Sequence, residues 1–272
     1  MKQIFDSLKK QSPSRIIALG FSAVILVGAV LLMMPFSLKK GVHLSFLNAL
    51  FTSTSAVCVT GLVVVDTADS FTAIGQAIVA ALIQIGGLGI ASVGVGFIIA
   101  AGKRVSIKSR LMVKEALNVD TYHGMVRLVR IVLAITLGFE AAGAIISFFV
   151  FRKDYSPLHA VGISIFHSIA AFNNAGFDNL GGMHNLIPYK DNILLNITTD
   201  VLVIVGGIGF LVLVDIVKQK SFKKLCLHSK VAIYDSRSFN RRNPDFKSNR
   251  KYYMDGSIFP EYDNKNCRIF NV

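Results

Sequence analysis

The sequence predicts an all-α integral membrane protein with two tandem helix–pore loop–helix units, made of four transmembrane helices and two re-entrant pore helices. Three observations predict this class. Of the 272 residues, 53% are hydrophobic and 17% are charged, which is less charge than a soluble domain carries. The apolar residues also form unusually long blocks. Finally, two glycine-containing motifs occur twice in the same order.

The repeated motifs indicate an internal duplication. Each copy has a short motif with one glycine, followed by a glycine-rich motif: residues 54–62 (TSAVCVTGL) then 84–90 (QIGGLGI), and residues 168–177 (SIAAFNNAGF) then 205–210 (VGGIGF). Gly176 follows Gly61 by 115 residues, and Gly206 follows Gly86 by 120 residues. Self-similarity at a nearly constant offset indicates a repeated structural unit.

The apolar blocks predict the spanning helices. They cover residues 16–36, 74–101, 128–151 and 193–217. Each reaches the length of about 20 residues that crosses a bilayer. The first block is longer than the apolar core of roughly 7–15 residues in a secretory signal peptide, so we interpret it as a membrane span.

These blocks divide the chain into five predicted segments. They are a cytoplasmic N-terminus (1–15), a first helix–pore loop–helix unit (16–101), a cytoplasmic basic loop (102–125), a second unit (126–217) and a cytoplasmic tail (218–272), which we expect to be disordered or frameshifted.

Basic residues predict the orientation. They gather before the first block, after the second and after the fourth: Lys2, Lys9, Lys10 and Arg15; Lys103, Arg104, Lys108, Arg110 and Lys114; Lys218, Lys220, Lys223 and Lys224. The positive-inside rule then places both termini and residues 102–125 in the cytoplasm, and the glycine loops outside. The net charge of +13 therefore indicates contact with inner-leaflet lipid. It does not indicate nucleic-acid binding, since no basic fold with interleaved aromatic residues accompanies it.

Two stretches between the spans are predicted to re-enter the membrane. Residues 42–58 and 156–171 are apolar or small, yet too short to cross. A short helix that descends from outside points its partially negative C-terminal end at the membrane centre, which favours a cation. The chain returns through residues 57–62 and 172–177, whose carbonyl groups can replace the hydration shell of a cation.

Candidate site residues lie in these return loops. Gly61 and Gly176 are the glycines that would turn neighbouring carbonyls toward a pore, and the alternative is an ordinary turn outside the membrane. The predicted filter comprises Val59, Thr60, Gly61, Asn173, Asn174, Ala175 and Gly176. Acidic residues follow both loops, and Asp66, Asp69 and Asp178 are either cation-attracting groups at an outer mouth or solvated loop carboxylates.

Other features of the spans allow two interpretations. Gly86, Gly87, Gly89, Gly206, Gly207 and Gly209 permit close helix packing or a kink. Glu140 and Asp200 lie within apolar blocks, where a charge is costly. Each of the two acids is either a functional group or structural glue paired to a neighbouring helix.

The sequence offers no pattern for catalysis or metal binding. The cysteines, Cys58, Cys226 and Cys267, form no C-x-x-C pair. No nucleophile, base and orienting group recur together. We therefore predict neither an enzyme nor a covalently bound cofactor.

The motifs resemble those of the Trk/Ktr/HKT potassium transporters, specifically the Ktr-type membrane subunit. The resemblance rests on residues 52–62 (TSTSAVCVTGL), Gly75 with Gln76, residues 84–89 (QIGGLG) and residues 172–177 (FNNAGF), and covers about residues 15–230. It implies four helix–pore loop–helix units around one potassium pathway, with Gly61 and Gly176 as two of four filter glycines. It also implies plasma-membrane localisation, a homodimer, a cytosolic nucleotide-binding regulatory subunit, and sodium that couples to transport or activates it.

The chain departs from this family after about Tyr234. There the sequence turns polar and continues to Val272 without another span-length apolar block. We expect a truncated or frameshifted reading, with a genuine half-length protein as the alternative. The predicted function is potassium uptake by the translocation subunit. The competing hypothesis is a non-conducting fragment, or a structural or inhibitory partner of a full-length transporter.

Overall fold

The structure, a computed structural model, describes residues 12–102, 104–117, 124–219 and 229–231. Within these ranges the chain is helical and forms no strand, apart from an isolated bridge between Leu38 and Phe71. Most of the predicted segments 1–15 and 218–272 lies outside the described residues. The all-α class is confirmed for the part that the structure describes.

Helices α2 (Pro13–Met33), α3 (Phe46–Cys58) and α5 (Ala73–Leu88) form the first group, with the short α4 (Thr67–Ser70) before α5. α3 packs against both α2 and α5. The side chain of Ser45 accepts a hydrogen bond from the amide of Asn48 at 3.2 Å and so fixes the start of α3.

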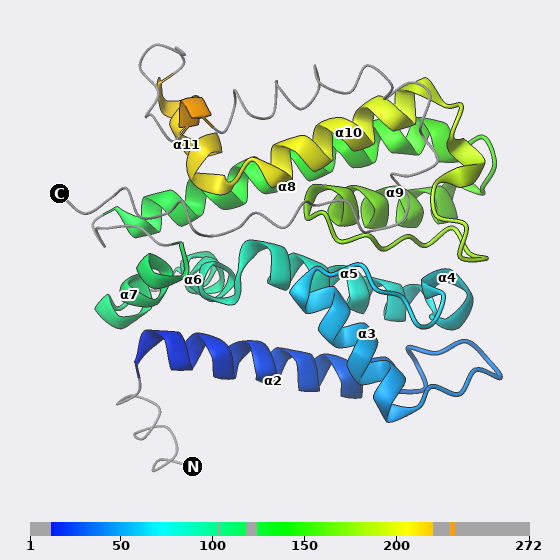
Figure 1. Cartoon of the computed structure of the whole chain (residues 1–272), viewed down its shortest axis with the longest axis horizontal. Coiled ribbons are helices and arrows are strands. Elements are labelled where there is room, and N and C mark those ends of the chain that lie inside the picture. The colour runs from blue at the N-terminus through cyan, green and yellow to red at the C-terminus, as the bar shows by residue number, and fades with distance from the viewer. Residues whose placement is uncertain (1–11, 103, 118–123, 220–228, 232–272) are drawn as a thin grey trace.

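Helices α8 (Met125–Phe151), α9 (Pro157–Phe172) and α10 (Ile193–Gly207) form the second group, with a 3-10 turn at Ile187–Tyr189. α9 packs on α8, and α10 packs on both. α5 also contacts α9, which joins the two groups (Figure 1).

The last helix of each group, α5 or α10, ends in a sharp bend, so the kink that the glycine-rich motifs allowed is present at both. α5 is followed by α6 (Ile90–Ala100) at 105°, and α10 by α11 (Phe210–Gln219) at 98°. Gly89 and Gly209 lie at these breaks with φ of +77° and +96°, a conformation that costs glycine little. α2 and α8 are long and apolar enough to cross a membrane, and the number of crossings reaches four if each bent pair is one span.

The cytoplasmic loop predicted at residues 102–125 contains a helix in its described part. α7 (Ile107–Ala116) begins after Ser106, whose side chain accepts from the amide of Ser109 at 3.2 Å. α7 packs against α2, α6 and α8.

The duplication reappears as matching hydrogen bonds in the two groups. Ser53 Oγ of α3 donates to the carbonyl oxygen of Ile25 in α2 at 2.8 Å. Ser168 Oγ of α9 donates to the carbonyl oxygen of Glu140 in α8 at 2.7 Å. Each residue of the second pair lies 115 positions after its counterpart. The first and second helices of each group therefore meet in the same register.

A second repeated contact involves the glycine-rich motifs. A Cβ atom at Gly86 would overlap the carbonyl oxygen of Val57 at the end of α3, and a Cβ atom at Gly206 would overlap that of Phe172 at the end of α9. These glycines therefore allow the backbone of α5 or α10 to lie directly against the last turn of the shorter helix. Close packing, one of the two interpretations of these motifs, is present at both.

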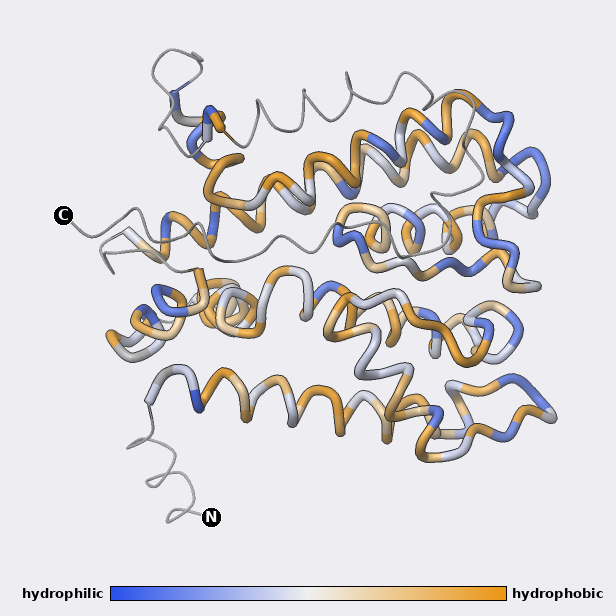
Figure 2. The backbone as a smooth tube through the Cα atoms, viewed as in Figure 1, coloured by the Kyte–Doolittle hydropathy of each residue, from blue (hydrophilic) through white to orange (hydrophobic). Residues whose placement is uncertain are grey.

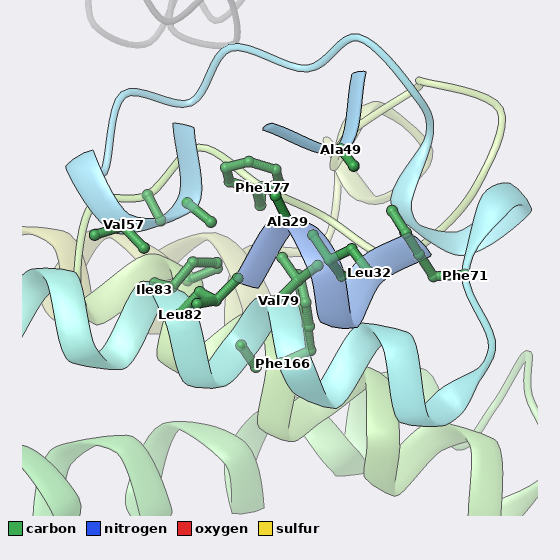
Figure 3. Packing of buried hydrophobic residues seen from close by; sticks show 14 of the residues in the cluster. Ala29, Leu32, Ala49, Val57, Phe71, Val79, Leu82, Ile83, Phe166 and Phe177 are labelled. Carbon is green, nitrogen blue, oxygen red and sulfur yellow. The ribbon is translucent and has the colours of Figure 1, made fainter. Parts of the chain in front are cut away.

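The main apolar cluster includes residues from both groups. Leu32, Val79 and Ile83 of the first group are fully buried, and Phe166 and Phe177 of the second group pack into the same cluster (Figure 3). Apolar packing thus joins the two halves.

Large apolar side chains also cover the outside. Leu47, Phe97 and Ile193 remain about 70% exposed in the structure, and Leu158 is 87% exposed. Apolar residues run along the lengths of α2, α8 and α10, and hydrophilic residues concentrate in the connecting loops (Figure 2). This distribution is the one expected of helices that contact lipid.

Candidate functional site

The site consists of the two loops that follow α3 and α9. Both helices end with the same backbone turn, in which an amide donates to a carbonyl five residues earlier. Thr60 N donates to Ser55 O at 3.0 Å, and Ala175 N donates to Ala170 O at 2.8 Å. Since both loops leave a helix C-terminus, unpaired carbonyl groups and the negative end of a helix dipole accompany each of them.

The two loops meet at their glycines. Val59 and Asn174 both have φ of 56°, and Gly61 and Gly176 have φ of +76° and +68°. A Cβ atom at Gly61 would lie 3.1 Å from Ala175 O, and one at Gly176 would lie 2.9 Å from Gly61 Cα. The structure thus brings Gly61, Ala175 and Gly176 together from segments 115 residues apart.

Polar side chains of the loops turn back toward the surrounding helices. Thr60 Oγ1 donates to Ser55 Oγ at 2.9 Å. Asn174 Nδ2 donates to the carbonyl oxygen of Val203 in α10 at 3.3 Å. These bonds tie the side chains of Thr60 and Asn174 to the surrounding helices.

Asn173, another predicted filter residue, is anchored behind the loop. Its Nδ2 donates to Gln84 Oε1 at 3.0 Å and to Glu140 Oε1 at 3.3 Å. Gln84 Nε2 donates to Glu140 Oε2 at 3.2 Å. Of the two interpretations of Glu140, the pairing with neighbouring polar groups is the one observed. The role of Asp200 stays a prediction.

Two of the three predicted outer-mouth acids, Asp66 and Asp69, join the two groups. Asp66 Oδ1 accepts from the amide of Asp69 at 2.8 Å and so caps α4. Asp66 Oδ2 accepts from the amide of Met183 at 2.7 Å, and Asp69 Oδ2 from the amide of Gly182 at 3.0 Å. Met183 has φ of 52°, so these bonds fix a strained loop of the second group to the first.

Asp178 directly follows the second loop and interacts electrostatically with Asp66 and Asp69. Its Oδ1 accepts from the amide of Leu180 at 3.0 Å. Burial raises the pKa of Asp178 above its usual range, the charges of Asp66 and Asp69 raise it further, and the Leu180 amide and His184 oppose the rise. The folded protein therefore holds the Asp178 proton more strongly than the unfolded chain does.

This shift predicts a pH dependence of stability. Since the folded-state pKa of Asp178 is raised, its contribution to the free energy of unfolding falls as pH rises from its usual pKa of 3.8 through the raised value. Asp178→Asn removes this dependence and keeps an oxygen for Leu180. Calorimetry at a series of pH values from 3.8 upward should therefore show less loss of melting temperature with rising pH for the variant than for the unmodified protein. Asp191→Asn, in an exposed position, is the control, and equal drops for Asp178→Asn and the unmodified protein would contradict the expectation.

Two glutamines of α5 belong to the site, although sequence analysis assigned them no role. Gln84 contacts Asn173, and Gln76 Oε1 accepts from Asn179 Nδ2 at 3.3 Å. They are eight residues apart and so lie on one face of the helix. Two amides on one face of an otherwise apolar span were the available signal for contact with a polar loop.

The apolar exterior, the bent helix pairs and the loops anchored at helix C-termini define a multi-pass membrane protein. Comparison with known proteins specifies it further. The family model described as TrkH, cation transport protein, matches residues 8–245. The chain belongs to this family, which is one of cation transporters and not of enzymes.

Curated relatives place the chain within the family. It is 40% identical over 225 residues to the potassium/sodium uptake protein NtpJ of Enterococcus hirae, covering 83% of this chain and 49% of the relative. It is 41% identical over 222 residues to Ktr system potassium uptake protein B of Bacillus subtilis, covering 82% and 49%. The Ktr system potassium uptake protein B of Vibrio alginolyticus is 36% identical over 230 residues, covering 84% and 50%.

These matches confirm the resemblance to Ktr-type membrane subunits. The chain spans about half the length of the curated relatives that it matches.

Proposed function

We propose that this chain forms half of a potassium uptake pathway of the Ktr type, as two tandem helix–pore loop–helix units. In this assignment α3 and α9 are the re-entrant pore helices, and α2, α5 with α6, α8 and α10 with α11 are the four crossings. The observation that carries the proposal is the meeting of Gly61 with Gly176, both at positive φ, at the C-terminal ends of two short apolar helices.

The proposed filter uses backbone carbonyls of the two loops. Residues 59–61 and 173–176 supply them, because their side chains are small, apolar or bonded to helices. Carbonyl oxygens at short range replace the hydration shell of potassium. Asp66, Asp69 and Asp178 lie at the outer mouth in this proposal, where their negative charge raises the local cation concentration.

The complete pathway requires further loops around the ion. Two loops supply carbonyls from only part of its surroundings, and Thr60 and Gly176 are exposed in the described part of the chain. We therefore propose that four such units surround one pathway in the plasma membrane. The resulting subunit forms a homodimer on a cytosolic nucleotide-binding regulatory subunit. The names of the relatives, Ktr system proteins and a potassium/sodium uptake protein, support potassium as the substrate and sodium as a coupling or activating ion.

The alternative function is that of a non-conducting fragment or an inhibitory partner of a full-length transporter. The same exposure of Thr60 and Gly176 favours it. A chain with two of the four loops can associate with a complete relative and disturb its ring of loops. In that case production of the chain beside such a relative lowers potassium uptake.

Growth at low external potassium distinguishes the two functions. The test uses a bacterial strain without potassium uptake that produces either residues 1–272 or residues 1–219 joined to the C-terminal half of the Bacillus subtilis relative. We expect growth with the joined protein and none with residues 1–272. Failure of the joined protein, together with impaired growth when residues 1–272 accompany the complete relative, would favour the inhibitory function.

We also propose that both termini face the cytoplasm. In a background without Cys58, Cys226 and Cys267, single cysteines at Lys40 and Asp191 are expected to react with a membrane-impermeant maleimide in intact cells. A cysteine at Lys108 is expected to react only after permeabilisation, because basic loops stay inside. Labelling of the cysteine at Lys108 in intact cells would reverse the orientation.

A further inference from the structure

Three polar side chains, one each from α5 and α8 and one from the residue that follows α9, form a closed hydrogen-bond network at the start of the second loop. Both carboxyl oxygens of Glu140 in α8 accept from amide groups, one from Gln84 of α5 at 3.2 Å and one from Asn173 at 3.3 Å. Asn173 Nδ2 also donates to Gln84 Oε1 at 3.0 Å. The network links the first group of helices, the second group and the loop.

This network is buried and closely packed. Glu140 is 6% exposed and Asn173 is 9% exposed. A Cβ atom at Gly87 would overlap Asn173 Oδ1, so the backbone of α5 presses directly on this side chain. Asn173 Nδ2 is further bonded to the carbonyl oxygen of Ile169 at 2.9 Å. Asn173 is therefore held on several sides, and it directly precedes the segment that meets Gly61.

The repeat shows that the fold of a unit does not require these three groups. By the offsets of 115 and 120 residues, Glu140 corresponds to Ile25, Asn173 to Cys58, and Gln84 to Ile204. The backbone carbonyl of Ile25 still accepts a hydrogen bond from Ser53 of α3, as the backbone carbonyl of Glu140 accepts one from Ser168 of α9. Since these three counterparts are an isoleucine, a cysteine and an isoleucine, the network is an addition to the fold of the unit. It lies where the second loop contacts the first unit.

We propose that Glu140 is a positioning residue for the second filter loop. Its carboxyl group fixes Asn173 against Gln84, and the carbonyls of residues 174–176 are thereby held at one distance from Gly61. A filter that selects between ions of different size depends on such fixed carbonyl positions. This inference rests on the proposed potassium pathway and adds a determinant of its ion preference.

An exchange experiment separates this role from simple stabilisation. Glu140→Gln preserves the size of the side chain but replaces one of the two acceptor oxygens with an NH2 group, which then faces another amide. The double variant Glu140→Gln with Gln84→Glu moves the carboxyl group to the other side of the same network and can restore all three contacts. Glu115→Gln makes the same chemical change at an exposed residue of α7 whose carboxyl accepts from Ser14.

The readout is the ratio of potassium to sodium uptake in cells that produce the joined protein described above, together with its amount in the membrane. Hydrogen bonds to a charged group are among the stronger ones, so we expect Glu140→Gln to lower the ratio about tenfold. We expect the double variant to recover most of this loss and Glu115→Gln to have no effect.

Two outcomes would overturn the inference while the transport function stands. One is an unchanged ratio in Glu140→Gln at a normal amount of protein. The other is a double variant with a ratio as low as that of the single variant. If Glu140→Gln does not accumulate, Gln84→Met tests the same network, because it removes both the donor to Glu140 and the acceptor for Asn173 and keeps the carboxyl group. An unchanged ratio in Gln84→Met also overturns the inference. A lack of selective uptake by the unmodified joined protein would instead contradict the proposed function.

Discussion

Serine in place of Gly61 or Gly176 is expected to lower the preference for potassium over sodium about tenfold, which corresponds to about 1.4 kcal/mol. Both glycines have positive φ, a conformation that costs residues with a Cβ atom roughly 1–2 kcal/mol. The added atom would also lie 3.1 Å from Ala175 O or 2.9 Å from Gly61 Cα, so the opposing loop has to move. The measurement is competitive uptake of rubidium, as a potassium analogue, and sodium by the joined protein.

Gly41→Ser is the matched control for this experiment. Gly41 also has positive φ, +84°, but nothing lies within 4 Å of the position of its Cβ atom. The control therefore carries the same backbone strain without a contact between loops. An unchanged ion preference in both filter variants would remove Gly61 and Gly176 from the filter. An equal loss in Gly41→Ser would show that strain in any loop is sufficient.

Alanine in place of Gly86 or Gly206 is expected to prevent accumulation of folded protein. In each case the new methyl group would overlap a carbonyl oxygen, that of Val57 or of Phe172. Overpacking a close contact costs about 1–3 kcal/mol and occasionally more, and backbone atoms at a helix end cannot rotate away as a side chain can. We expect loss of the monodisperse peak in size-exclusion chromatography of detergent extracts.

Gly94→Ala provides the comparison for the two helix glycines. Gly94 lies in α6, with nothing within 4 Å of the position of its Cβ atom. Because alanine favours a helix over glycine by about 0.5–1 kcal/mol, this variant should be as stable as the unmodified protein or slightly more stable. Normal yields of Gly86→Ala and Gly206→Ala would contradict the packing described for α5 and α10.

The helical class and the repeat could be predicted from the sequence, because both depend on local composition. Block lengths of about 20 residues and glycine motifs repeated at a nearly constant offset can be read without knowing which helices touch. A kink at the glycine-rich motifs was one of two interpretations, but the bends of 105° and 98° could not be chosen over close packing in this way. The blocks continue through Gly89 and Gly209 without a polar residue or a proline, and glycine permits a bend without requiring one.

The candidate loops could be located from the motifs, but their partners could not be identified. Glu140 was recognisable as a costly charge in an apolar block. Its partners, Gln84 and Asn173, lie 56 and 33 residues away along the chain, and the packing of α9 against both α5 and α8 brings the three together. Similarly, the local sequence does not reveal whether Asp66 is a solvated carboxylate or an acceptor for the amide of Met183.

The contacts that join the two groups of helices set an order for biogenesis. Gly61 meets Gly176, and Asp66 accepts from Met183, over separations of 115 and 117 residues. At a synthesis rate of about 5–20 residues per second, the first loop waits roughly 6–23 s before its partner leaves the ribosome. The amide of Gln84 waits for the carboxyl group of Glu140 over 56 residues, or roughly 3–11 s. The first loop has no second loop against it throughout the longer interval. A holding factor in the insertion machinery, or retention of α5 at the lateral exit of the translocon, would protect these polar groups from lipid until the second half arrives.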